Sequence, residues 1–280
     1  MPTPQGPQNL ESFGSSGWTL GELSGTVTDE LVEKLAAMQP ELKHLNLSCC
    51  YSMTDDALGY LHLPTLQTLL LADNYQLTGI GLRALNLPQL RVLCLCNIGY
   101  YSTDASRLIS EGLLQANLPA LAELDMNGVA CGVHQMCAIL SRFNQKLTRL
   151  DMSACNDATS TQDLVRALLE HGQKLSELAL SEHLCSEQNL LTLASLSLTH
   201  IELFGDRVTD SSLRVLASSY HRLHQLRLLS AKHVTDKGVV MLLQTSGSLK
   251  ELELEDVEQV SAITSVFADE SLRLRGGSLI

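Results

Sequence analysis

The stretch from Glu41 to Leu61 reads ELKHLNLSCCYSMTDDALGYL and decides the fold. Its leading apolar positions lie three, two and three residues apart, at Leu42, Leu45, Leu47 and Cys50. Because side chains alternate between the two faces of a strand, Leu45 and Leu47 predict a short strand with one buried face. Thr54-Asp55 then opens a segment whose apolar residues have helical spacing. The stretch therefore predicts a strand, an inward-turning corner and a helix.

The same pattern recurs along the rest of the chain. The first leucines of the regular repeats are Leu42, Leu66, Leu90, Leu121, Leu147, Leu175, Leu198, Leu223 and Leu249. Their mean spacing of about 26 residues lies within the range of about 20–29 that is typical of repeats with one strand and one helix. One repeat cannot bury its leucines alone, so we expect the repeats to stack with their strands parallel.

Both ends of the repeat array are irregular. Residues 1–17 are rich in Pro, Gly and Ser and predict a flexible tail. Trp18 begins a first repeat that departs from the pattern and continues into a helix over Glu30–Met38, as expected of a capping repeat. A final Leu272-x-Leu274 predicts one more strand. We therefore expect a tail over residues 1–17 and one domain of about ten repeats over residues 18–280.

The repeat pattern resembles a known family. Leu-x-x-Leu-x-Leu-x-x-Cys followed by a hydrophobic residue, Thr and Asp is complete over Leu42–Asp55 and partial at Val208–Asp210 and Val234–Asp236. The chain resembles leucine-rich repeat proteins of the cysteine-containing class from about Leu20 to Leu274. It is similar to the repeat regions of F-box proteins and of the antagonist-of-mitotic-exit-network family. The resemblance implies a right-handed α/β solenoid, or horseshoe, with a concave parallel sheet and convex helices.

The resemblance also implies a role. In F-box members, the repeats hold a substrate while a separate helical F-box docks on the adaptor of a ubiquitin ligase. Only about 17 residues precede the first repeat here, which is too few for an F-box. We therefore expect the repeats to recognise a substrate, with ubiquitin-ligase subunits among the partners. The pattern contains no segment that would dock on the ligase adaptor as an F-box does.

Composition and charge restrict the partners. The chain has 45% hydrophobic but only 4% aromatic residues, which predicts an aliphatic core. Its net charge of −12 disfavours nucleic acids and anionic membranes and favours basic partners. No apolar run approaches the roughly 20 residues that span a bilayer, and the N-terminal segment lacks a signal-peptide pattern. We expect a soluble protein of the cytoplasm or nucleus.

The cysteines predict a reduced protein. Several of Cys49, Cys50, Cys94, Cys96, Cys131, Cys137, Cys155 and Cys185 fall in strands or corners, where a small apolar side chain fits. Cys94-x-Cys96 and Cys131-x-x-His134-x-x-Cys137 are weak metal signals, because no fourth ligand has zinc-site spacing. We therefore expect no metal and no other cofactor.

Threonine–aspartate pairs precede several predicted helices. The pairs are Thr28-Asp29, Thr54-Asp55, Thr209-Asp210 and Thr235-Asp236. We expect each threonine hydroxyl to cap its own helix and each aspartate to place negative charge at the helix N-terminus. This interpretation makes the pairs structural rather than catalytic.

The side chains that point out of the sheet are the candidate binding residues. The early strands supply apolar side chains and the later strands supply acidic ones, relieved by two arginines. The candidates are Leu70, Val92, Cys94, Cys96, Glu123, Asp125, Asn127, Arg149, Asp151, Glu177, Glu202, Phe204 and Arg227. Polar residues are ordinary on an exposed face, but contiguous exposed apolar surface often marks a contact site. We expect a protein partner whose apolar segment contacts the early strands and whose basic residues reach the later ones.

Catalytic motifs are lacking in the sequence. No serine lies in a nucleophile elbow, and Gly276-Gly277 has neither the helix nor the lysine of a phosphate loop. The sequence thus predicts a non-enzymatic interaction module. Two alternatives stay open: a structural scaffold or assembly subunit without a ubiquitin link and, more remotely, a metal-binding protein or an enzyme.

One local motif matches the C-terminal tail of ubiquitin. Residues 272–277 read LRLRGG, and Ser278-Leu279-Ile280 follow them. A leucine-rich strand supplies Leu-x-Leu by itself, and Gly-Gly readily ends a strand. We interpret the match as coincidental.

Overall fold

The computed structural model describes residues 11–12, 17–19, 26–99, 104–129, 131–153, 161–261 and 273–277. Side chains are described within residues 26–261 of these ranges. The chain comprises two compact units, Met1–Cys131 and Gly132–Ile280. Cys155 and the segment Tyr100–Thr103 lie outside the described residues.

The N-terminal unit is built from parallel strands alternating with helices. Its strands are β1 (Glu11–Ser12), β2 (Gly17–Thr19), β3 (His44–Asn46), β4 (Thr68–Leu70), β5 (Val92–Cys94) and β6 (Glu123–Asp125). Its helices are α1 (Asp29–Met38), α2 (Asp56–Gly59), the 3₁₀ helix η3 (Ile80–Ala84) and α3 (Ala105–Gln115). Strands β2 to β6 pair in chain order and parallel, whereas β1, which lies within the predicted tail, pairs antiparallel with β2.

The C-terminal unit repeats this plan. Its strands are β7 (Arg149–Asp151), β8 (Glu177–Leu180), β9 (His200–Phe204), β10 (Gln225–Leu229), β11 (Glu251–Glu255) and β12 (Arg273–Gly277). Its helices are α4 (Val133–Phe143), α5 (Thr161–His171), the 3₁₀ helix η5 (Glu182–Leu184), α6 (Glu187–Leu193), α7 (Asp210–Ser219) and α8 (Asp236–Thr245). All six strands pair parallel and in chain order.

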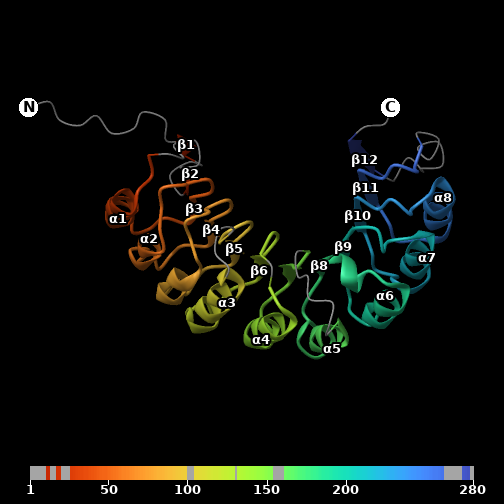
Figure 1. Ribbon diagram of the computed structural model, residues 1–280, viewed down its shortest axis with the longest axis horizontal. Coiled ribbons are helices and arrows are strands. Elements are labelled where there is room, and N and C mark those ends of the chain that lie inside the picture. Colours follow the sequence, from red (N-terminus) through yellow and green to blue (C-terminus); the bar gives the residue numbers. More distant parts are fainter. Residues whose placement is uncertain are drawn as a thin grey trace, which may run out of the picture. The chain divides into compact units, whose positions relative to one another are not determined.

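The leucine spacing produces the core as predicted. Leu45, Leu69 and Leu93 are opposite one another on β3, β4 and β5, and each is at most 1% exposed. The residues on either side of these leucines are only partly buried. In each unit the helices cover one face of the sheet (Figure 1), so the leucines are enclosed between sheet and helices. The predicted α/β leucine-rich repeat solenoid is confirmed.

A left-handed residue follows most strands, which the sequence pattern did not reveal. Backbone φ is +61° at Cys49, +59° at Asp73 and +55° at Asn97, and it is +74° at Gly128. This conformation turns the chain sharply toward the interior, and Asn, Asp and Gly tolerate it better than other residues. Asn97 Nδ2 donates to Asp73 Oδ1 at 2.9 Å, so neighbouring corners are also bonded to each other.

The predicted threonine caps are present at some positions and wrong at others. Thr209 forms a capping box with Ser212 of α7, and Thr54 Oγ1 accepts from the Asp56 amide of α2 at 3.4 Å. Thr28 and Thr235 lie at the N-caps of α1 and α8, within the part of the chain that the structure describes, yet neither makes a side-chain cap bond to its own helix. The Thr235 hydroxyl and amide instead donate to Asp210, at 2.7 and 2.9 Å. Thr54 donates in the same way to Asp29, at 2.6 and 2.8 Å.

Bonds of this kind join consecutive repeats at four places among the described residues. The acceptor is the aspartate of the preceding Thr-Asp pair, some 25 residues earlier in the chain. Asp55 accepts from Thr78, and Asp236 accepts from Ser261, in the same arrangement. We call these contacts the aspartate ladder. These pairs therefore stabilise the stacking of repeats, and the Thr209 pair also caps its own helix.

The ubiquitin-like segment is part of the sheet. Arg273–Gly277 forms β12 and pairs parallel with β11, with Leu252 opposite Leu274 and Leu254 opposite Gly276. The predicted last strand is therefore confirmed. The pairing of this backbone with β11 agrees with the interpretation that the LRLRGG match follows from the repeat pattern.

A glycine in α8 makes room for the ladder, and its replacement tests the contact. A Cβ at Gly238 would lie 2.0 Å from Asp210 Oδ1, the atom that accepts from the Thr235 amide. Gly→Ala inside a helix usually stabilises by up to about 1 kcal/mol, but here we expect Gly238→Ala to destabilise by about 1–2 kcal/mol, because Asp210 must move. Urea unfolding measures the change. Gly59→Ala, with no atom within 4 Å of the new Cβ, should be neutral or stabilising and is the control.

Candidate functional site: the sheet face opposite the helices

In the N-terminal unit the strand register brings most of the apolar candidates together. Leu70, Cys94 and Asp125 are opposite one another on β4, β5 and β6, and Val92 is opposite Glu123. These side chains are partly buried and lie on the sheet face away from the leucine core. Cys96 and Asn127 follow β5 and β6, with Asn127 exposed. The predicted grouping of these candidates on one surface is thus present within this unit.

Cys94 is a hydrogen-bond donor on this surface. Its thiol donates to Asp125 Oδ2 at 3.4 Å. Burial and, to a smaller extent, the negative charge of Asp125 raise the pKa of the Cys94 thiol to about 12. A thiol with such a pKa is protonated at neutral pH, which disfavours both nucleophilic attack and thiolate ligation. Among the described residues, no three His, Cys, Asp or Glu side chains are grouped so as to hold a metal ion.

In the C-terminal unit the charged candidates form two rows across the sheet. One row is Arg149, Glu177, His200, Gln225 and Glu251; the next is Asp151, Ala179, Glu202, Arg227 and Glu253. The register therefore brings together the five predicted charged residues of this unit. Phe204, at the end of β9, is 42% exposed and lies opposite Leu229.

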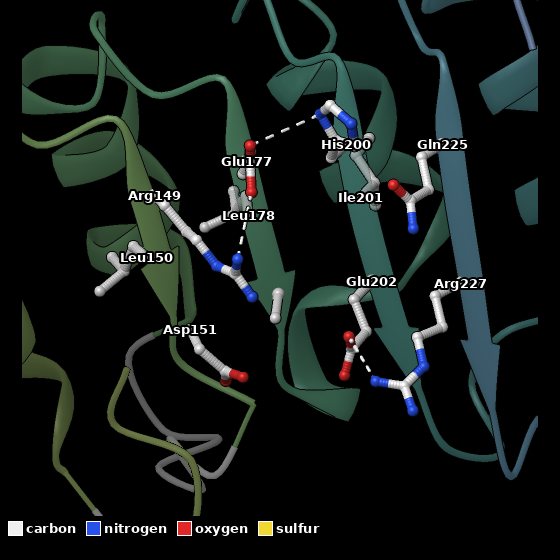
Figure 2. Close-up of a pocket in the computed structure, with 11 residues that line it drawn as sticks. Arg149, Leu150, Asp151, Glu177, Leu178, His200, Ile201, Glu202, Gln225 and Arg227 are labelled. Atoms are coloured by element: carbon white, nitrogen blue, oxygen red, sulfur yellow. Dashed lines mark hydrogen bonds and ion pairs between the residues drawn. The ribbon is translucent and has the colours of Figure 1, made fainter. Parts of the chain in front are cut away.

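A pocket opens between these two rows. It has a volume of about 130 Å³ and is lined by side chains of β7 to β10, shown in Figure 2. Ala179 has a methyl group where neighbouring strands present Asp151 and Glu202, so the sheet surface is depressed at this position. The sequence pattern favoured charged residues and missed Ala179, His200 and Gln225 as lining residues.

Arg227 is surrounded by carboxylates on one side of the pocket. Its guanidinium lies 3.2 Å from Glu202, 3.5 Å from Glu253 and 2.7 Å from Glu255. Burial raises the pKa of the Glu202 carboxyl; Arg227 counteracts this shift, and the charge of Asp151 adds to it. One cation among three carboxylates leaves an excess of negative charge on this side.

A second charged group lies along the other row. Arg149 is 3.5 Å from Glu177, and His200 Nδ1 lies 3.8 Å from the same carboxylate (Figure 2). His200 Nδ1 is also 2.9 Å from the Thr199 hydroxyl. Asp151 is oriented by Ser153, whose amide and hydroxyl both donate to Asp151 Oδ1, at 2.9 and 2.6 Å. These contacts orient the charged side chains relative to one another.

Within the described residues, no helix combines the length and apolar character needed to cross a membrane.

Comparisons with known proteins support the fold. No family model matches the chain, and no curated protein does. Among solved structures, the leucine-rich repeat-containing protein LegL7 from Legionella pneumophila is similar, with a TM-score of 0.53 and 20% identity over 90% of this chain and 88% of that one. A chain from the yeast Rad7–Elc1 complex has a TM-score of 0.51 and 14% identity over 90% of this chain and 79% of that one. At these identities the likeness shows the fold alone.

Proposed function

We propose that this protein is a non-catalytic protein-interaction module that binds its partner on the sheet face opposite the helices. The observation that carries the proposal is the register that gathers Asp151, Glu177 and Glu202 around a pocket in the C-terminal unit. Side chains that are prearranged on rigid strands lose little entropy on binding, which favours recognition over solvation as their role. The partner has basic residues for this face and an apolar segment for the surface around Leu70, Val92 and Cys94.

We further propose that the partner is a substrate delivered to a ubiquitin ligase. The support is the similarity of the repeat pattern to the substrate-holding repeats of F-box proteins. Rad7, one of two proteins in the similar yeast structure, is found there in complex with Elc1. By analogy, this chain would combine substrate binding with contact to ligase subunits.

Affinity capture with charge-reversed variants tests the proposal. We expect Asp125→Lys and Asp151→Lys each to weaken capture of a basic partner at low salt, because each change replaces attraction by repulsion. Glu170→Lys, at an exposed position of α5, is the control and should leave capture unchanged. Mass spectrometry of the captured proteins identifies the partner and any ligase subunits.

Two outcomes would count against the proposal. Equal capture by all variants would show that the sheet face is not the binding site. One stable large assembly that survives charge reversal would instead support the structural scaffold, which binds through other surfaces.

A further inference from the structure

We infer that the pocket over Ala179 is a subsite for a single arginine side chain of the partner. This inference rests on the proposed function and adds the identity of one recognised residue. Ala179, the small residue between Asp151 on β7 and Glu202 on β9, is one of the residues that line the pocket.

The charge around the pocket favours a cation. Both arginines nearby are already engaged: Arg149 with Glu177, and Arg227 with three glutamates. Among the lining residues, the carboxylates of Asp151, Glu177 and Glu202 outnumber the two guanidinium groups. Glu253 and Glu255 contact Arg227 from outside the pocket and add further negative charge. An anionic ligand would have to displace one of these ion pairs, whereas a cation adds to the network without breaking it.

The hydrogen bonds of Glu202 leave it suited to a further donor. Its contact with Arg227 is 3.2 Å, longer than the 2.7 Å between Arg227 and Glu255. Arg227 therefore binds most closely to the carboxylate farther from the pocket. A carboxylate offers about four acceptor positions, so Glu202 retains capacity for a ligand above Ala179.

Shape favours arginine over lysine. Neighbouring strands are about 4.8 Å apart, so the backbones that hold Asp151 and Glu202 are separated by about 10 Å across β8. A planar guanidinium with five N–H donors can donate to carboxylates on both sides, whereas an ammonium is a compact point charge. The methylene stem of arginine would pack on the Ala179 methyl group.

Filling the pocket is compatible with the fold. Leu70 and Arg227 occupy the same repeat position as Ala179 on β4 and β10, so this position accepts large side chains. Ala179→Leu should therefore occupy the pocket while the leucine core stays intact. An unchanged amide spectrum away from β8 and an unchanged thermal midpoint would verify the fold.

The test is an NMR titration of the full ¹⁵N-labelled chain with Nα-acetyl-arginine methylamide. We expect saturable shifts of the amides of residues 178–180 and 201–203, with a Kd on the order of 1–10 mM, as suits a ligand this small. The lysine analogue should bind at least about threefold more weakly, because it cannot donate to both carboxylates. Glu202→Gln and Asp151→Asn should each weaken arginine binding by about tenfold, and Ala179→Leu should abolish it. Glu170→Gln on α5 should change nothing.

The inference is overturned if these amides do not shift, if arginine and lysine analogues bind equally, or if Ala179→Leu leaves binding intact. The titration needs no protein partner, so it separates the two proposals. Arginine binding without capture of a partner would refute only the proposed function. If Ala179→Leu leaves the binding of the partner unchanged, only the arginine subsite is refuted.

Discussion

Asp55→Ala should lower the free energy of unfolding by about 3 kcal/mol, because it removes an acceptor that serves several donors at once. Asp55 accepts from the amide and hydroxyl of Thr78, at 3.0 and 2.7 Å, and from the amides of Gly79 and Gly81, at 3.1 and 3.0 Å. Without the carboxylate, three backbone amides at the start of the next repeat lose their partner. Such groups are costly to leave unpaired when they are partly buried.

The site of the loss distinguishes this mechanism from general destabilisation. Hydrogen exchange should speed up first at the amides of Thr78, Gly79 and Gly81. Asp56→Ala is the control: Asp56 is exposed in the first turn of α2, and its charge there is worth about 0.3–1 kcal/mol. Equal losses from Asp55→Ala and Asp56→Ala would contradict the role assigned to the aspartate ladder.

Asn74→Ala should cost about 2–4 kcal/mol, since it leaves two buried carbonyls without a donor and creates a cavity. Asn74 is fully buried at the corner after β4, and its Nδ2 donates at 2.8 Å to the carbonyl oxygens of both Leu47 and Leu71. The side chain thus joins the corners of two consecutive repeats. Urea unfolding of the full chain measures the change.

Two further variants sharpen this result. Asn74→Cys should cost less than Asn74→Ala, because Cys50 fills the equivalent corner of the preceding repeat and is likewise fully buried. Gln76→Ala, at an exposed position two residues away, should stay within about 0.5 kcal/mol of the parent. A cost for Asn74→Ala no greater than that for Gln76→Ala would refute the account of this corner.

The strands and core follow from the sequence because the leucine spacing has one good solution. Leu45 and Leu47 must share a face of a strand, and the recurrence near 26 residues stacks those faces into a core. The candidates on the opposite face, such as Asp151 and Glu202, follow from the same alternation. The sequence therefore predicts the features that depend on the repeat period alone, namely the strands, the buried leucines and the residues of the opposite sheet face.

Contacts between repeats were harder to predict, because they depend on which side chains become neighbours after stacking. The sequence predicts that Thr54 caps the helix after it and that Asp55 places negative charge at the start of that helix. In the structure the Thr54 hydroxyl donates to Asp29, and Asp55 accepts from Thr78 of the next repeat. The separation of roughly one period between Asp29 and Thr54 was the available signal.

The pocket was missed for a different reason. The sequence pattern selects charged residues as binding candidates. Ala179 contributes to the pocket because its side chain is smaller than those of Asp151 and Glu202 beside it. A small residue in a row of large ones is visible in the sequence once the strands are aligned by repeat. Its effect on the surface depends on the register with Asp151 and Glu202.

The proposed function requires that the sheet face, not the helix face, binds the partner. Isothermal titration calorimetry of the full chain with the captured partner tests it most directly. Asp151→Lys should weaken binding at least about tenfold at low salt and less at high salt, since the lost attraction is electrostatic. Glu170→Lys should stay within about twofold of the parent. Equal affinities for the parent and Asp151→Lys, or a larger loss for Glu170→Lys, would show that the sheet face does not bind the partner.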